Sequence, residues 1–207
     1  MSQLFDKVKG TITSFNASSI TDTNANFKVD YYKGWWVVID NVDYKIESNT
    51  TNSLTFWNSI PSNLPYSIQF ISRTSINDFE SDASDSFKIP DDIIDKKYNQ
   101  ANTDINNKAL IYLRGLYSDT FIPLENILNL TVLQSSFIYY TLSKIYQDLI
   151  IDRESFEAFK AYNMYEKSYK DNIADALNLL QVDLNQDGVA NTEELNKSAS
   201  SVHYFIR

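Results

Sequence analysis

The residues with the clearest chemical pattern are the oxygen donors between positions 183 and 194, which read DLNQDGVANTEE. Their spacing matches a twelve-residue calcium loop, in which oxygen ligands stand at positions 1, 3, 5, 7, 9 and 12. Gly188 falls at position 6, where such a loop turns sharply. The spacing therefore predicts a Ca²⁺ site with these ligands: Asp183, Asn185, Asp187, the backbone carbonyl of Val189, Asn191 and Glu194.

The loop follows a predicted helix, as in an EF-hand, but it departs from the usual form in two ways. EF-hand loops usually occur in pairs, whereas this chain has a single one. Position 8 is Ala190, which is smaller than the β-branched residue that joins paired loops. We therefore expect a structural clip with a dissociation constant of about 10⁻⁵ to 10⁻³ M, not a calcium sensor. The alternative is an Asp- and Asn-rich turn that ends the helix and is capped by Gly188.

The C-terminal sequence SSVHYFIR is a candidate docking segment. Its apolar residues alternate as they would in a strand added to the sheet of a partner. Such a strand has two faces: Val202, Tyr204 and Ile206 on one, and His203, Phe205 and Arg207 on the other. A frayed terminus is the alternative interpretation.

Trp35 and Trp36 are a second candidate for partner docking. Adjacent residues of a strand point to opposite faces, so we expect one tryptophan in the core and the other at the surface. The outer one would then be available to a partner, unless a loop or the second domain covers it.

Composition argues against an enzyme. The chain has one histidine, four glycines and no cysteine, which leaves no glycine-rich phosphate loop and no cysteine nucleophile. The net charge of -9 is unlike that of a general binder of nucleic acid or anionic membranes. Polar residues interrupt every long apolar run, and the first residues lack the pattern of a secretion signal, so we expect a chain that folds in a cytoplasm.

The first 75 residues predict a small antiparallel β barrel or sandwich. Short alternating runs separated by turn residues indicate the strands, with a tight turn at Asp40 and Asn41. The expected strands cover 7–13, 27–31, 35–39, 42–47, 54–57 and 66–70. The acidic, polar stretch 76–88 is interpreted as a linker between two domains.

From residue 89 the apolar period becomes helical, which predicts an α+β chain with a C-terminal helical bundle over 89–182. A first helix is expected from Pro90 to the glycine at 115, which would take the left-handed cap position. A buried central helix is expected over 123–151, with Leu133 and Phe137 in its apolar seams. The third helix begins near Arg153, and its aromatic stripe predicts core packing: Phe156, Phe159, Tyr162, Tyr165 and Tyr169. The calcium loop then leads to a docking tail at 195–207.

Residues 89–182 resemble the helical head-to-tail adaptor proteins of tailed bacteriophages. Matching positions in the first helix, the turn, the bend and the buried helix are Asp92, Ile93, Ile94, Asp95, Ala101, Ile105, Gly115, Tyr117, Pro123, Tyr139 and Tyr140. The segment 171–180 is similar to the family's last helix, and the first 75 residues look like a β module that recurs in phage structural proteins.

This resemblance implies a structural role in the virion neck, with assembly in the host cytoplasm. Such adaptors form a ring of about a dozen copies that binds the portal, meets the next neck or tail ring and extends the DNA channel. An acidic channel wall would repel DNA phosphates, so DNA would slide through without specific binding. The alternative is a calcium-dependent binding module for a carbohydrate or protein ligand, built on the β domain and its tryptophans.

Overall fold

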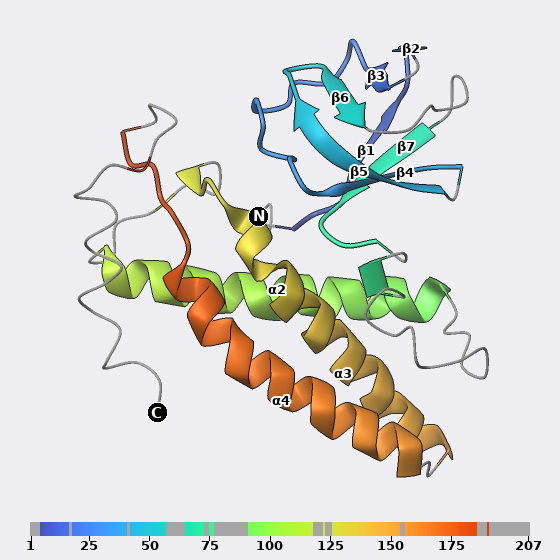
Figure 1. The fold of residues 1–207 in the computed structure, drawn as a ribbon, viewed down its shortest axis with the longest axis vertical. Coiled ribbons are helices and arrows are strands. Elements are labelled where there is room, and N and C mark those ends of the chain that lie inside the picture. Colours follow the sequence, from blue (N-terminus) through green and yellow to red (C-terminus); the bar gives the residue numbers. More distant parts are fainter. Residues whose placement is uncertain are drawn as a thin grey trace. The chain divides into compact units, whose positions relative to one another are not determined.

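A computed structural model describes residues 5–16, 18–40, 42–56, 65–72, 75–76, 91–117, 122, 126–153, 156–185 and 190. The chain divides into two compact units: Phe5–Asp78, and Phe79–Arg207 together with Met1–Leu4. The first unit is an antiparallel sheet and the second is helical, which confirms the predicted α+β class (Figure 1). The division falls inside the segment that we interpret as a linker.

The β unit is one antiparallel sheet with the strand order β1-β7-β4-β5-β6-β3-β2. Its strands are β1 (Val8–Thr11), β2 (Ser14–Asn16), β3 (Ser19–Thr21), β4 (Trp36–Ile39), β5 (Val42–Asn49), β6 (Ser53–Phe56) and β7 (Pro65–Gln69). Alternate residues of these strands are buried, such as Val37, Leu54 and Ile68, because successive side chains of a strand point to opposite faces. Asp40 has a φ of 50° in the tight turn between β4 and β5, as the sequence predicts.

The sheet curls on itself, because strands β1 and β2 lie at its opposite edges yet follow each other in the chain. Only Ile12 and Thr13 separate them, and three Cα steps span at most about 11 Å. A flat sheet of this width would hold its edges about 29 Å apart. Thr13 also continues the β2–β3 pairing, since its N–H donates to the Thr21 carbonyl at 2.8 Å. This curvature is that of the predicted small barrel.

The strand predicted at 27–31 is wrong, because this stretch forms turns. The buried side chain of Asn49 binds the backbone of these turns: Nδ2 donates to the Lys28 carbonyl at 2.7 Å, and Oδ1 accepts from the Tyr32 N–H at 2.9 Å. Asp30, between them, has a φ of 55°. The Asn49 side chain thus holds these turns, together with backbone bonds from Phe27 N–H to the Thr51 carbonyl and from Asp30 N–H to the Asn49 carbonyl.

The helical unit contains α2 (Asp91–Leu116), the 3₁₀ turn η2 (Leu130–Leu133), α3 (Gln134–Arg153) and α4 (Phe156–Asn178). Helices α3 and α4 form an antiparallel hairpin, and α2 crosses it (Figure 1). The predicted bundle is therefore not confirmed as a set of nearly aligned helices. Among the described residues, no helix has the length and hydropathy that a membrane span requires.

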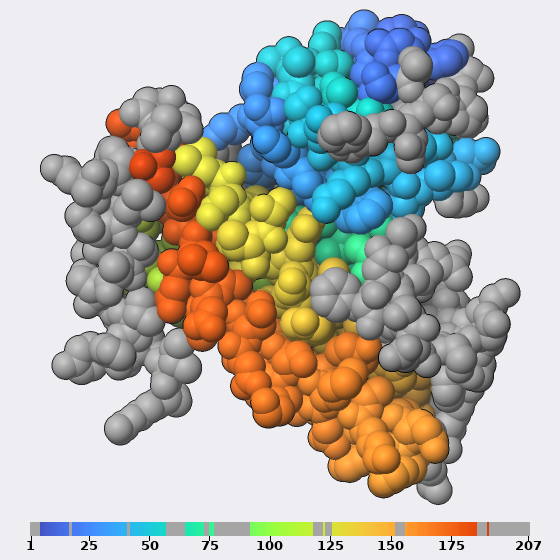
Figure 2. Space-filling model, in the orientation of Figure 1, coloured from blue at the N-terminus to red at the C-terminus, as the bar shows by residue number. Residues whose placement is uncertain are grey.

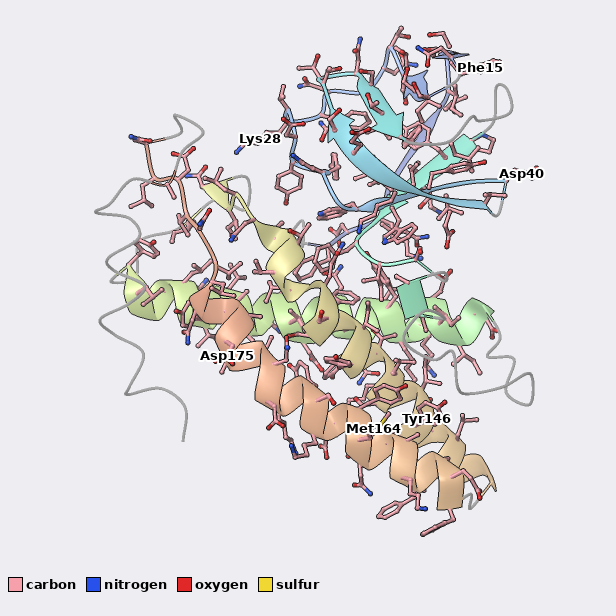
Figure 3. The ribbon with its side chains drawn as sticks, in the orientation of Figure 1. Phe15, Lys28, Asp40, Tyr146, Met164 and Asp175 are labelled. Carbon is pink, nitrogen blue, oxygen red and sulfur yellow. The ribbon has the colours of Figure 1, made fainter. Side chains whose placement is uncertain are left out.

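The core of this unit matches the apolar pattern of the sequence over most of its length. Leu133 and Phe137 are fully buried, as predicted. Tyr146 of α3, labelled in Figure 3, stacks on Tyr165 of α4 with ring centroids 5.8 Å apart. An ion pair joins α2 to α3: Nζ of the buried Lys97 lies 2.6 Å from Oδ2 of the partly exposed Asp148.

Three details of the helices differ from the prediction. The central helix begins at Gln134 and not at 123, since residues 126–129 pair with a distant segment. Gly115 lies inside α2, and the Tyr117 N–H donates across it to the Leu113 carbonyl at 3.0 Å, so it is not a left-handed cap. Phe156 and Phe159 are exposed and not in the core, because the α3–α4 hairpin continues past its crossing with α2 (Figure 1).

Candidate functional site

The predicted calcium loop begins at the end of a short antiparallel ribbon made of residues 126–129 and 179–183. Ile127 and Val182 face each other at its centre. The Leu128 N–H donates to the Gln181 carbonyl at 3.0 Å, and the Asp183 N–H donates to the Asn126 carbonyl at 2.8 Å. The ribbon therefore fixes the backbone of Asp183, the first predicted ligand.

The side chain of Asn129 strengthens this ribbon at its other end. Its Oδ1 accepts from the Gln181 N–H at 2.8 Å, and its Nδ2 donates to the Leu179 carbonyl at 2.8 Å. A single side chain thus satisfies two backbone groups where α4 ends. The chain that leaves α4 is held against the segment that precedes α3.

Asp183 and Asn126 stand directly opposite each other in this ribbon. Their backbone bond and the Ile127–Val182 bridge fix the register, and opposite residues of such a pair have side chains on the same face. Asp183 is only 1% exposed and Asn126 only 4%. The Oδ1 atom of Asn126 is buried and has no hydrogen-bond partner among the described residues. Two buried oxygen-bearing side chains therefore lie on the same face of the ribbon where the loop begins.

The other predicted ligands are placed only in part. Asn185 is exposed. Asp187, Val189, Asn191 and Glu194 lie outside the described residues. Within the described ranges, no group of three or more His, Cys, Asp or Glu side chains is arranged to hold a metal.

The two tryptophans lie in different surroundings, as the sequence predicts. Trp35 is only 1% exposed and packs against Phe70 with ring centroids 5.1 Å apart. Trp36 is partly exposed, and Lys45 Nζ lies 5.9 Å from its ring centroid. A partner could therefore reach Trp36 but not Trp35, so the docking role predicted for the pair applies to Trp36 alone. The predicted docking residues from Val202 to Arg207 lie outside the described residues.

The β unit also has a hollow of about 430 Å³ that the sequence analysis does not predict. Buried Asp22 is one of the residues that line it, and Tyr66 Oη donates to Asp22 Oδ2 at 2.9 Å. The Thr11 N–H donates to the same oxygen at 3.3 Å, and the Asn24 N–H donates to Oδ1 at 2.9 Å. Burial, followed by the bond to Asp22, raises the pKa of Tyr66 above its ordinary value. The carboxylate thus links β1, β7 and the turn after β3.

Four further lining residues give this hollow the composition of a small-ligand pocket. Aromatic rings and amides line it together, a mixture typical of sites for polar ligands: Phe27, Tyr32, Asn24 and Asn26. Of these, only the spacing of Asp22 and Asn24, typical of an Asx turn, is a local sequence signal. Tyr66 is distant in sequence, so no local pattern could place it here.

Comparison with known proteins gives no relative to argue from: no family model, no curated protein and no solved structure matches this chain. The function is therefore inferred from the residues and their geometry.

Proposed function

We propose that this chain is a structural protein of the neck of a tailed bacteriophage. It forms a connector ring that binds the portal and extends the DNA channel toward the tail. The proposal rests on the resemblance of residues 89–182 to head-to-tail adaptors. The observation that supports assembly is the exposed apolar end of the α3–α4 hairpin.

This end, which we call the hairpin tip, consists of Ile151, Phe156 and Phe159. Their side chains are 75%, 62% and 49% exposed. Phe156 and Phe159 are three residues apart on α4, so they share one side of the helix. Figure 2 shows this end of the hairpin, in orange, at the molecular surface.

Burial of the hairpin tip would favour association. Covering one such side chain is worth roughly 1.5–3 kcal/mol. In a ring, each copy presents one patch to a different patch on the next copy, and rotation closes the assembly. We therefore assign the hairpin tip to the contact between neighbouring copies. The net charge of -9 suits a channel from which DNA is repelled.

Calcium belongs to the same proposal. The loop from Asp183 to Glu194 lies between α4 and the tail at 195–207. A bound Ca²⁺ would fix the direction in which the tail leaves α4 toward the portal or a neighbouring copy. The ribbon at 126–129 and 179–183 supports this role, because it anchors the first residue of the loop.

Light scattering of the purified chain, separated by size, tests the assembly. We expect masses well above the 23.9 kDa of one chain. Changing Phe156→Ser and Phe159→Ser together should reduce them while leaving the helices folded. Phe15→Ser is the matched control, since Phe15 is also an exposed phenylalanine but lies on β2 (Figure 3). A parent chain that stays monomeric at every concentration would contradict the proposal.

The second candidate is a calcium-dependent module that binds a carbohydrate or protein ligand. The hollow that Asp22 lines favours it, because its volume lies within the range of small-molecule sites. The two candidates differ in a simple way. A monomer that binds glycans through this hollow, and loses them on Tyr32→Ala, would favour the module over the connector.

A further inference from the structure

We propose that Asn126 is a calcium ligand from outside the predicted loop, and that Asn126 and Asp183 together form the inner wall of the cation site. The inference rests on the calcium loop of the proposed function, and adds to it a residue from a separate part of the chain. The spacing of loop ligands cannot reveal this residue, because Asn126 reaches the site through the fold.

The register of the ribbon places the two side chains together. Asp183 N–H donates to the Asn126 carbonyl at 2.8 Å, and the neighbouring pair Ile127 and Val182 forms the bridge. Side chains of directly opposite residues lie on one face of a ribbon, within reach of a common ligand. Ile127 and Val182 are buried on the other face.

Burial makes this pair unusual. The carboxylate of Asp183 belongs to a residue that is 1% exposed, and the carboxamide oxygen of Asn126 is buried without a hydrogen-bond partner among the described residues. Buried polar atoms are nearly always satisfied, so such an oxygen calls for an explanation. A cation between the two side chains would bind the oxygen of Asn126 and an oxygen of the Asp183 carboxylate.

The donor set selects calcium among common cations. Both groups offer oxygen, which hard cations prefer to nitrogen or sulfur. Calcium accepts six to eight oxygens in flexible geometry, including carboxylates and Asn carbonyls, whereas Mg²⁺ requires a near-ideal octahedron and keeps several waters. A ligand added from outside the loop is therefore compatible with calcium.

The proposed contact would also replace the support that a paired loop gives. Asn126 lies shortly before η2 and α3, and Asp183 follows α4. A cation held by both residues would tie the start of one helix of the hairpin to the end of the other. A single loop would then be held against its own domain and would need no second loop.

Calcium titration of the full chain by calorimetry, together with melting curves with and without calcium, tests the inference. Asn126→Leu removes the oxygen and keeps the size. We expect calcium affinity to fall by about tenfold or more, while the melting temperature without calcium does not fall, since a buried unsatisfied atom is removed. Asn126→Asp retains an oxygen, so it should bind calcium and should recover in calcium the stability that two adjacent carboxylates lose without it.

The outcomes separate this inference from the loop on which it rests. Asp187→Ala with Glu194→Gln should abolish binding if the loop exists. If that double variant loses calcium while Asn126→Leu binds as tightly as the parent, the role of Asn126 is overturned and the loop stands. If the parent shows no heat and no rise in melting temperature in millimolar calcium, both are overturned. If Asn126→Leu does not fold, failure of Asn126→Asp to bind calcium would equally overturn the role of Asn126.

Discussion

Gly10 is a residue of the β unit where an added Cβ atom would clash with its neighbours. A Cβ at this position would lie 2.4 Å from Asp22 Oδ2 and 2.4 Å from Tyr66 Oη. Both atoms belong to the buried bond that links the turn after β3 to β7. The absence of a side chain at Gly10 is therefore what allows Asp22 and Tyr66 to meet over β1.

We expect Gly10→Ala to destabilise the β unit by about 1–3 kcal/mol, as overpacking of a filled site does. Urea unfolding monitored by tryptophan fluorescence measures it, since Trp35 is in this core. Gly115→Ala is the control: Gly115 is exposed within α2, in the unit that holds no tryptophan, so alanine there should leave the unfolding of the β unit unchanged. Equal effects of the two changes would contradict the close approach at Gly10.

Two buried tyrosines should differ in how much stability the protein loses when each hydroxyl is removed. Tyr66→Phe removes the bond to Asp22 and should cost about 1–3 kcal/mol at neutral pH. Tyr169→Phe should cost little, because the Tyr169 hydroxyl is buried without a hydrogen-bond partner among the described residues. Denaturant midpoints of the two variants test this contrast.

The same tyrosines predict a loss of stability in alkali. Burial is the main cause that raises the pKa of both Tyr66 and Tyr169 above the ordinary value of 10.0. Above that pH the unfolded chain releases these protons and the folded chain keeps them, so stability is full below pH 10 and falls as pH rises further. Each Phe variant should show a shallower fall between pH 10 and 11 than the parent. An unchanged slope in both would contradict burial of these hydroxyls.

The proposed calcium site shows how far single residues can be predicted from sequence. Local spacing alone predicts Asp183 as a ligand, and the structure fixes its backbone in the ribbon. Asn126 carries no such signal, because its relation to Asp183 depends on pairing between distant segments. The same holds for Asp22 and Tyr66, which are brought together only by the order of the strands.

Among the elements, helices are predicted best where a long apolar period is present. Helix α2, Asp91–Leu116, agrees closely with the pattern. The start of α3 does not, since the apolar residues before Gln134 form a ribbon and a 3₁₀ turn instead. An apolar run predicts that a segment is buried. It does not predict whether the backbone of that segment hydrogen-bonds locally, as in a helix, or to a distant segment.

The strands, too, depend on partners that are distant in the sequence. The β2–β3 hairpin, from Ser14 to Thr21, lies in a stretch whose polar composition predicts irregular structure. Its turn is closed by the Asn16 side chain, whose Oδ1 accepts from the Ser18 N–H at 3.0 Å. Pairing with β6 then provides a partner that the local sequence cannot specify.

A buried aromatic contact joins α2 and α3 where the two helices cross. Phe137 is fully buried, and its ring lies 5.0 Å from that of Tyr98 on α2. Phe137→Asp would bury an unpaired charge and should destabilise by more than about 4 kcal/mol, enough to unfold the helical unit. Ile111→Asp is the control, because Ile111 is exposed on α2. Circular dichroism should show helix loss in the first variant only, and a folded Phe137→Asp would contradict this core.

At the level of the whole molecule, the proposed functional features lie on different units. The helical unit carries the resemblance to adaptors, the exposed hairpin tip and the anchored start of the predicted calcium loop. The β unit, with its hollow and the partly exposed Trp36, offers a separate surface for a partner. The aromatic stripe of α4 predicts only core packing, so the sequence pattern could not reveal that its first turn, with Phe156 and Phe159, is exposed.

Negative-stain imaging of the purified full chain in millimolar calcium tests the central claim of ring assembly most directly. We expect closed rings with a central channel, because contacts between different patches close when rotation brings the last copy back to the first. The variant with Phe156→Ser and Phe159→Ser should show far fewer rings. Fields of single small particles at every concentration, or open filaments in place of rings, would contradict a connector.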